Sequence, residues 1–261
     1  MGYSLLVLWY FGPVVSCISV GLFYSLNKLI VTPSVVRRSP LLQWRWRNIT
    51  VSLIHSAITG LASILCFYEV PKMAEDMIEI HTNKSHLLVA LSTGYFIYDF
   101  IDMSLNHRCR NSYELMAHHA FVILCFGITV CTKLYVGYAL AALLVEVNNV
   151  FLHVRQLMGI VNISKSNPWY RLNSLVNLAT FILFRVVTLA WMTRWLVVHR
   201  ELVPLYAYTC GSIGLAAIVL MSIVLFFRLL NSDFGPKRNK EREAHSRPNE
   251  ALSLEFAKKK D

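Results

Sequence analysis

Seven long apolar stretches divide the sequence and constrain its fold more than any other feature. They cover residues 5–31, 49–70, 87–105, 115–132, 134–160, 175–198 and 205–230. A helix needs about 20 apolar residues to cross the hydrocarbon core of a bilayer, and each stretch is close to or above that length. A backbone inside lipid must satisfy its own hydrogen bonds, and the alternating pattern of a membrane strand is missing. We therefore predict about seven transmembrane helices.

The composition agrees with an all-α integral membrane protein. Only 15% of the 261 residues are charged, against about 25% in soluble domains. The first stretch has no basic segment before it and is too long for the apolar part of a signal peptide, so it should remain as a helix. We expect residues 1–43 to form this N-terminal helix and a basic cytosolic linker. Residues 44–231 then hold six further helices, and the polar residues 232–261 form a disordered basic tail.

The distribution of Lys and Arg predicts the orientation, because these residues accumulate on the cytoplasmic side. They are concentrated before the second stretch, after the third, between the fifth and sixth, and in the tail. This places the N-terminus outside and the C-terminus in the cytosol. The net charge of +10 is dispersed over loops, so we expect no nucleic-acid partner. Asn83, in the triplet Asn83-Lys84-Ser85, falls in an outer loop and is a candidate for glycosylation.

Polar side chains within the apolar stretches are the candidate functional residues. An ionised side chain at the bilayer centre costs at least about 2.5–3.5 kcal/mol, so it usually has a purpose. The candidates are His55, Tyr95, Asp99, Asp102, Glu114, His118, His119, Glu146, Asn149, His153 and Arg185.

Helical spacing groups several of these candidates. It places Tyr95, Asp99 and Asp102 on one face of the third helix, and it aligns Glu146, Asn149 and His153 along one stripe of the fifth. Two interpretations remain open: a polar cavity for a lipid headgroup, or a structural network in which Arg185 pairs with Asp99, Asp102 or Glu146.

The sequence predicts neither a metal site nor a cofactor. His118 and His119 are neighbours, and they project about 100° apart around a helix. No HxxHH or HExxH pattern accompanies them. The paired histidines are nevertheless the candidates for catalysis, should the chain be an enzyme.

Several short motifs follow one another in a fixed order. They are Trp44-Arg45-Trp46-Arg47-Asn48, Ser52, His55-Ser56, Gly94-Tyr95-Phe96 with Asp99 and Asp102, Glu114-Leu115-Met116-Ala117-His118-His119, Leu143-Leu144-Val145-Glu146-Val147-Asn148-Asn149 and Leu183-Phe184-Arg185. Over residues 44–231 this set resembles the TLC-domain family, which includes ceramide synthases and translocation-associated membrane proteins. The resemblance implies a barrel of six helices around a lipid-accessible cavity, with one extra helix at the N-terminus. Whether that helix packs on the barrel stays open.

The resemblance also implies a test for catalysis. In ceramide synthases the paired histidines and a following His-Asp…Asp motif transfer an acyl group from acyl-CoA to a sphingoid amine. This chain keeps the pair, but it has Val145 in place of the His, Glu146 in place of the first Asp and Asn149 in place of the second. Acyl transfer needs a base or nucleophile tuned by a neighbouring carboxylate. The changed motif favours a protein that handles lipids without catalysis.

The family members that the chain resembles most are regarded as regulators of membrane phospholipid composition. They limit the incorporation of long-chain polyunsaturated fatty acids into phospholipids and so reduce membrane fluidity. The resemblance thus implies phospholipids or fatty acyl chains as partners. A His-dependent acyltransferase and a membrane modulator of a channel or transporter are the alternatives, and a homo-oligomer or a membrane-protein partner is compatible with each.

The relatives point to the plasma membrane. The last residues, Lys258-Lys259-Lys260-Asp261, resemble a retrieval signal, so the endoplasmic reticulum is the alternative location.

Overall fold

The computed structural model describes residues 2–106 and 110–233, with the side chains at 2–9, 38, 110–112, 114 and 233 left undescribed. This part of the chain is almost entirely helical and contains no strand. Seven of its helical segments are long and apolar enough to cross a membrane, which confirms the predicted all-α membrane class. Residues 234–261 of the predicted tail, including its terminal lysines, and the Glu114 side chain lie outside the described part.

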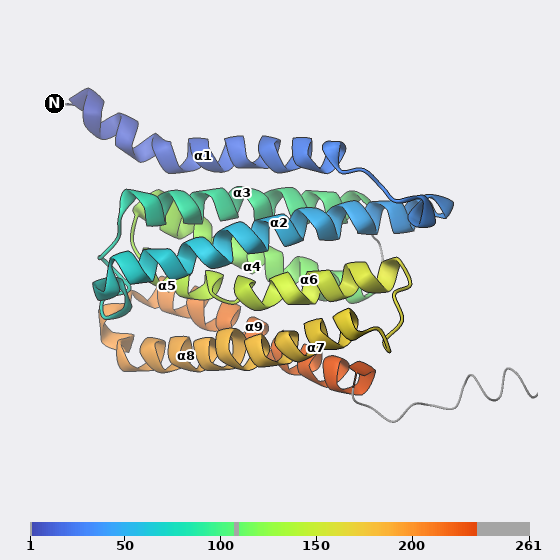
Figure 1. The fold of residues 1–261 in the computed structure, drawn as a ribbon. Coiled ribbons are helices and arrows are strands. Elements are labelled where there is room, and N and C mark those ends of the chain that lie inside the picture. Colours follow the sequence, from blue (N-terminus) through green and yellow to red (C-terminus); the bar gives the residue numbers. More distant parts are fainter. Residues whose placement is uncertain (1, 107–109, 234–261) are drawn as a thin grey trace, which may run out of the picture. The chain divides into compact units, whose positions relative to one another are not determined.

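The helices follow the chain in a simple order (Figure 1). They are α1 (Gly2–Leu29), η1 (Ser34–Arg38), α2 (Pro40–Glu69), η2 (Pro71–Ala74), α3 (Asn83–Asn106), α4 (Arg110–Thr132), α5 (Val136–Leu143), α6 (Glu146–Ile160), α7 (Pro168–Phe181), η3 (Ile182–Val187), α8 (Thr188–Val198), η4 (Arg200–Leu202) and α9 (Leu205–Asp233). The chain up to Ser222 forms one compact unit. All packing described below lies within that unit.

The second transmembrane helix begins earlier than its apolar stretch. α2 starts at Pro40 rather than at residue 49, and proline suits the first turn of a helix because its missing N–H would have no partner there. The aromatic and basic motif that begins at Trp44 is therefore helical. This places Trp44 and Asn48 on the same helix as His55, about three and two turns before it.

Two transmembrane segments are not regular α-helices. The fifth apolar stretch is interrupted at residues 144–145, between α5 and α6. The sixth begins at Pro168 and contains the π-helical turn η3 between α7 and α8. Hydropathy cannot reveal either feature, because the residues at both places are mostly apolar. π-helical turns inside α-helices occur frequently at functional sites.

A tight turn joins α4 to α5. Lys133 and Tyr135 both take a left-handed backbone conformation, with φ of 59° and 63°. The Tyr135 N–H donates a hydrogen bond of 2.7 Å to the carbonyl of Ile78. The two helices therefore form a hairpin, as the single basic residue Lys133 between the two apolar stretches predicts.

The N-terminal helix packs along α3 (Figure 1). The Ser16 hydroxyl donates to the carbonyl of Ala90 over 2.9 Å, and the Ser19 hydroxyl donates to that of Leu91 over 2.6 Å. The backbone at Gly94 lies so close to Ser16 and Ser19 that a β-carbon has no room there. Small residues and interhelical hydrogen bonds drive helix association in lipid, so α1 is docked on the bundle.

The other helices pack around the candidate polar residues. α2 packs against α3 and α6, α4 packs against α3 and α5, and α8 packs against α5. The largest buried apolar cluster joins α2, α3, α4 and α5 through residues such as Val51, Val89, Phe126 and Leu140.

We expect Gly94→Leu to loosen the contact between α1 and α3. The added side chain has to displace backbone and Ser19, and overpacking of this kind costs about 1–3 kcal/mol. Gly21→Leu is the matched control, because a β-carbon at this exposed α1 position meets nothing within 4 Å. Thermal unfolding of the purified protein in detergent should show a lower Tm for Gly94→Leu alone. Equal Tm values for the two variants would contradict this packing.

Candidate functional site

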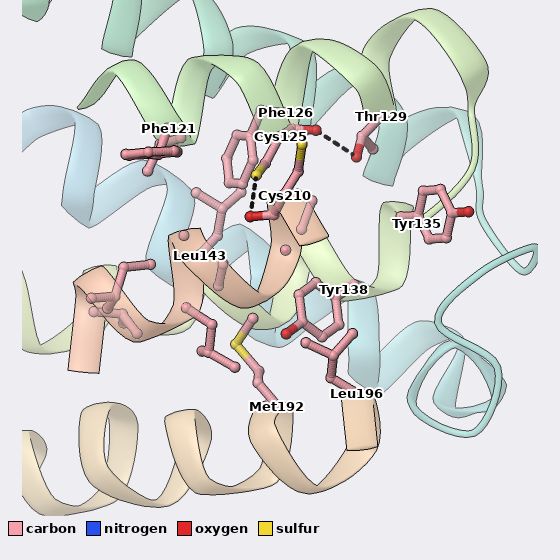
Figure 2. A pocket seen from close by; sticks show the side chains of 18 of the residues that line it. Phe121, Cys125, Phe126, Thr129, Tyr135, Tyr138, Leu143, Met192, Leu196 and Cys210 are labelled. Carbon is pink, nitrogen blue, oxygen red and sulfur yellow. Dashed lines mark hydrogen bonds between the residues drawn. The ribbon is translucent and has the colours of Figure 1, made fainter. Parts of the chain in front are cut away.

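A cavity of about 150 Å³ lies inside the helix bundle. Its wall comes from α4, α5, α6, η3, α8 and the first half of α9, with Phe96 added from α3. Figure 2 shows Phe121 and Phe126 of α4, Leu143 of α5 and Met192 of α8 around the same space. The lining is mostly apolar, as a site for a lipid tail requires.

Four of the candidate residues gather at one end of this cavity: His118, Glu146, Asn149 and Arg185. The Asn149 amide bridges the two charged groups. Its nitrogen donates to Glu146 Oε2 over 3.0 Å, and its oxygen accepts a hydrogen bond of 2.5 Å from Arg185 Nη2. Ser56 of α2 also donates to Glu146 Oε2, over 2.5 Å. The cavity therefore combines an apolar body with a hydrogen-bonded polar end.

Helix irregularities place the two charged groups. Glu146 is the first residue of α6, directly after the break in the fifth transmembrane segment. A helix N-terminus favours a negative side chain. Arg185 lies within the π-helical turn η3. Gly60 of α2 lets α6 approach closely here, since a β-carbon at Gly60 would lie 2.9 Å from the Val147 nitrogen.

In the described structure Arg185 forms no ion pair with Asp99, Asp102 or Glu146. Its hydrogen bonds go to neutral groups, namely the Asn149 amide and the Ser222 hydroxyl of α9, the latter over 3.2 Å. Within the described part of the chain its Nε has no hydrogen-bond partner, although the residue is only 8% exposed. An unsatisfied buried donor typically costs about 1–3 kcal/mol, so this N–H favours an additional acceptor.

The paired histidines face different surroundings. His118 lines the cavity, and its Nδ1 is buried with no hydrogen-bond partner among the described residues. His119 points away from the cavity lining and toward α3, where its Nε2 lies 3.0 Å from Asp99 Oδ2. Its Nδ1 donates to the Leu115 carbonyl over 2.7 Å. The two rings are 5.5 Å apart and nearly perpendicular.

The acids of α3 bind to α2 rather than line the cavity. Asn48 Nδ2 donates to Asp99 Oδ1 over 2.6 Å and to Asp102 Oδ2 over 3.1 Å. The Trp44 indole donates to Asp102 Oδ2 over 2.8 Å. Tyr95, on the same face of α3, donates to the Ser52 hydroxyl over 2.8 Å. These contacts lock α2 to α3 beside the cavity.

His55 lies between this network and the cavity end. It is fully buried and stacks on the Tyr95 ring with 3.7 Å between ring centroids. Its Nδ1 is 4.0 Å from Glu146 Oε2, and neither ring nitrogen has a hydrogen-bond partner in the described structure. His153 lies one turn beyond Asn149, where its Nδ1 is 3.5 Å from the Gln156 side-chain oxygen.

Sequence reasoning did not single out several residues that complete the site. Ser56, Asn48, Trp44 and Ser52 occur in the quoted motifs, and their four-residue spacing on α2 is the signal that could have identified them as one polar face. Asn148 was also missed. It is fully buried and its side chain donates to the carbonyl and the side chain of Asn177, both over 3.0 Å, which joins α6 to α7.

Asn83 lies apart from the cavity, at the first residue of α3, and is exposed. No group of three or more His, Cys, Asp or Glu side chains in the described residues is placed to hold a metal ion. The geometry of the cavity end instead suits hydrogen bonding to the polar head of an amphiphile.

Comparison with known proteins agrees with this architecture. The sequence model of the TLC-domain family matches residues 45–231. TLC domain-containing protein 2 from Danio rerio is 54% identical over 229 residues, which cover 86% of this chain and 91% of the relative. The human TLC domain-containing protein 2 is 37% identical, covering 82% of this chain and 79% of the relative. The mouse TLC domain-containing protein 1 is 35% identical, covering 81% and 84%. Because the matched domain spans all of α3 to α8 and nearly all of α2 and α9, including the cavity and its polar end, the chain belongs to the TLC-domain family.

Proposed function

We propose that this chain handles membrane lipids without catalysis and limits the incorporation of long-chain polyunsaturated fatty acids into phospholipids. By doing so it lowers membrane fluidity. Membership of a lipid-related membrane family supports a lipid role in general, and the cavity supports the finer proposal.

The observation that carries the proposal is the combination of an apolar cavity with a buried polar end. Lipids are amphiphiles, so a site for one needs both parts. The polar end lies near the middle of the membrane-spanning segments, about ten residues into the segment Val136–Ile160 and well inside Pro168–Val198. Ionisable residues at this depth are costly and usually serve a pathway or a ligand.

The arrangement of the histidines argues against acyl transfer. A catalytic histidine needs access to the substrate and a partner that orients it. Among the described residues, His118 has the access but makes no hydrogen bond to a carboxylate, whereas His119 has Asp99 as its partner but does not line the cavity. The two requirements are divided between two side chains.

One observation favours the acyltransferase alternative. His118 lines the cavity and its buried Nδ1 has no partner among the described residues. An unpartnered imidazole nitrogen near a lipid tail is chemically able to act as a base. The experiment below tests whether the function requires His118.

We further propose the plasma membrane as the location, with the N-terminus outside and the C-terminus in the cytosol. The basic loops support this orientation. The endoplasmic reticulum remains the alternative location.

Deleting the protein from cells supplied with docosahexaenoic acid should raise the polyunsaturated share of phospholipid acyl chains, measured by mass spectrometry. Wild-type protein should reverse the change. His118→Ala should reverse it at least half as well as the control His153→Ala, which alters a membrane histidine outside the cavity lining. Unchanged phospholipids after deletion would refute the proposed function. Failure of His118→Ala together with success of His153→Ala would show that His118 is functional, either as the base of an acyltransferase or as a contact to the lipid headgroup.

The proposed orientation makes Asn83 a glycosylation site. Asn83→Gln should abolish the shift in electrophoretic mobility that a glycosidase produces, because the exposed side chain then faces the lumen during synthesis. Asn162→Gln, in the triplet Asn162-Ile163-Ser164 on the opposite side, should leave the shift unchanged. A shift that depends on Asn162 instead would reverse the orientation.

A further inference from the structure

We propose that the cavity binds a single-chain fatty acid as its carboxylate, with Arg185 holding the head and the small residues of α9 forming the wall that selects the tail. This inference rests on the proposed function and deepens it by naming the ligand class. Two independent features carry it: the donor geometry of Arg185, and the shape of the α9 face.

Arg185 lines the polar end of the cavity and carries a buried donor without a partner among the described residues. Its Nη1 and Nη2 are used by Ser222 and Asn149, while Nε has no partner among the described residues. A guanidinium presents its N–H groups in a planar fork that matches a carboxylate, and Nε belongs to one edge of that fork. The ligand that completes this geometry is an acceptor, and a carboxylate completes it best.

The hydrogen-bond partners of Arg185 also leave a place for an anion. Glu146 receives hydrogen bonds from Ser56 and Asn149, so donors already stabilise its charge. Among the described residues, Arg185 donates hydrogen bonds only to neutral acceptors. Asn149 turns its nitrogen to Glu146 and its oxygen to Arg185, and so separates the two charges. An anionic headgroup at Arg185 would supply the counter-charge that the described residues do not place in contact with it.

The part of the α9 wall that precedes Leu215 and Ile218 carries only small side chains. Ala207, Cys210, Gly211 and Gly214 lie on the cavity side of this helix. A β-carbon at Gly211 would meet no atom within 4 Å, and one at Gly214 would contact only Cys125 Sγ, at 3.6 Å. The space at this level is therefore bounded by the α9 backbone, and Phe121 and Phe126 of α4 line the same cavity (Figure 2).

The cavity extends from Arg185 past the α9 wall. Trp195, which also lines it, is ten residues from Arg185, or about 15 Å along a helix at 1.5 Å per residue. The body of the cavity is mostly apolar, although Tyr138 and Trp195 also line it. One charged end and one body of this length fit one chain rather than the two tails of a phospholipid. The glycines leave the width that a bent, polyunsaturated chain needs, so Gly211 and Gly214 are the specificity-determining positions.

Photolabelling of the full chain in phosphatidylcholine nanodiscs tests whether the site recognises the carboxylate head of a fatty acid. The probe is a sixteen-carbon fatty acid with a diazirine on its tail. Labelled residues should map to α4 and to the Ala207–Gly214 side of α9. Docosahexaenoic acid should compete at least tenfold better than its methyl ester or lysophosphatidylcholine. Equal competition by the methyl ester would overturn the carboxylate assignment, and preferential competition by lysophosphatidylcholine would assign the site to a lysophospholipid instead. Because this arm uses wild-type protein, it decides the point even if Arg185 variants do not fold.

Two variants test the proposed roles of Arg185 and Gly211. Arg185→Gln should lower labelling at least tenfold, and Gly211→Leu should lower it at least fivefold by filling open space without a backbone clash. Ala216→Leu, at an exposed position of the same helix outside the lining, is the matched control and should label like wild type. Thermal unfolding checks that each variant is folded. Wild-type labelling of folded Gly211→Leu would overturn the role of the α9 wall.

The outcome is separable from that of the proposed function. If deletion of the protein changes phospholipid acyl chains but the fatty acid probe does not label the cavity, this inference fails while the proposed function stands. If the probe labels the cavity as described but deletion has no effect on phospholipids, the proposed function fails and the binding site stands.

Discussion

The buried carboxylate of Glu146 is the constraint on which the rest of the site depends. An unpaired carboxylate in the middle of a membrane is too costly to keep, so donors must be brought to it. Ser56 of α2 donates to this carboxylate, and so does Asn149 in the next turn of α6. The Asn149 oxygen in turn accepts a hydrogen bond from Arg185. These hydrogen bonds join α2 to α6 and α6 to the η3 turn. The helices around the polar end are thus held by one set of coupled contacts.

The same constraint explains the irregular helices. Glu146 is at the start of α6 because the fifth segment breaks before it, and Arg185 lies where the sixth segment becomes a π-helix. Both irregularities occur at the level of the cavity end, where side chains from several helices must converge. The close approach of α2 at Gly60 completes the arrangement. Elsewhere the lining is mostly apolar, and its polar atoms come from side chains such as Thr129, Tyr138 and Trp195.

Much of the fold follows from the sequence, because membrane spans are long apolar runs. The seven segments, the hairpin around Lys133 and the shared face of Tyr95, Asp99 and Asp102 are all found in the structure. The site was less predictable. Helical spacing places Asp99 and Glu146 on faces of their own helices, but it cannot tell which neighbour each face meets. Asp99 meets α2 and His119, whereas Glu146 reaches the cavity. The break before Glu146 and the π-turn at Arg185 leave no signal in hydropathy.

The measurement that tests this account most directly is a double-mutant cycle between Glu146 and Arg185. Thermal stability in detergent would be compared for Glu146→Gln, Arg185→Gln and the double variant. Removing one partner of a buried charged network leaves the other unbalanced and typically costs about 3–5 kcal/mol. We predict that each single variant lowers Tm clearly and that the double variant is much less unstable than the sum of the two. Strictly additive effects would show that the two charges are independent, and would contradict a single coupled polar site.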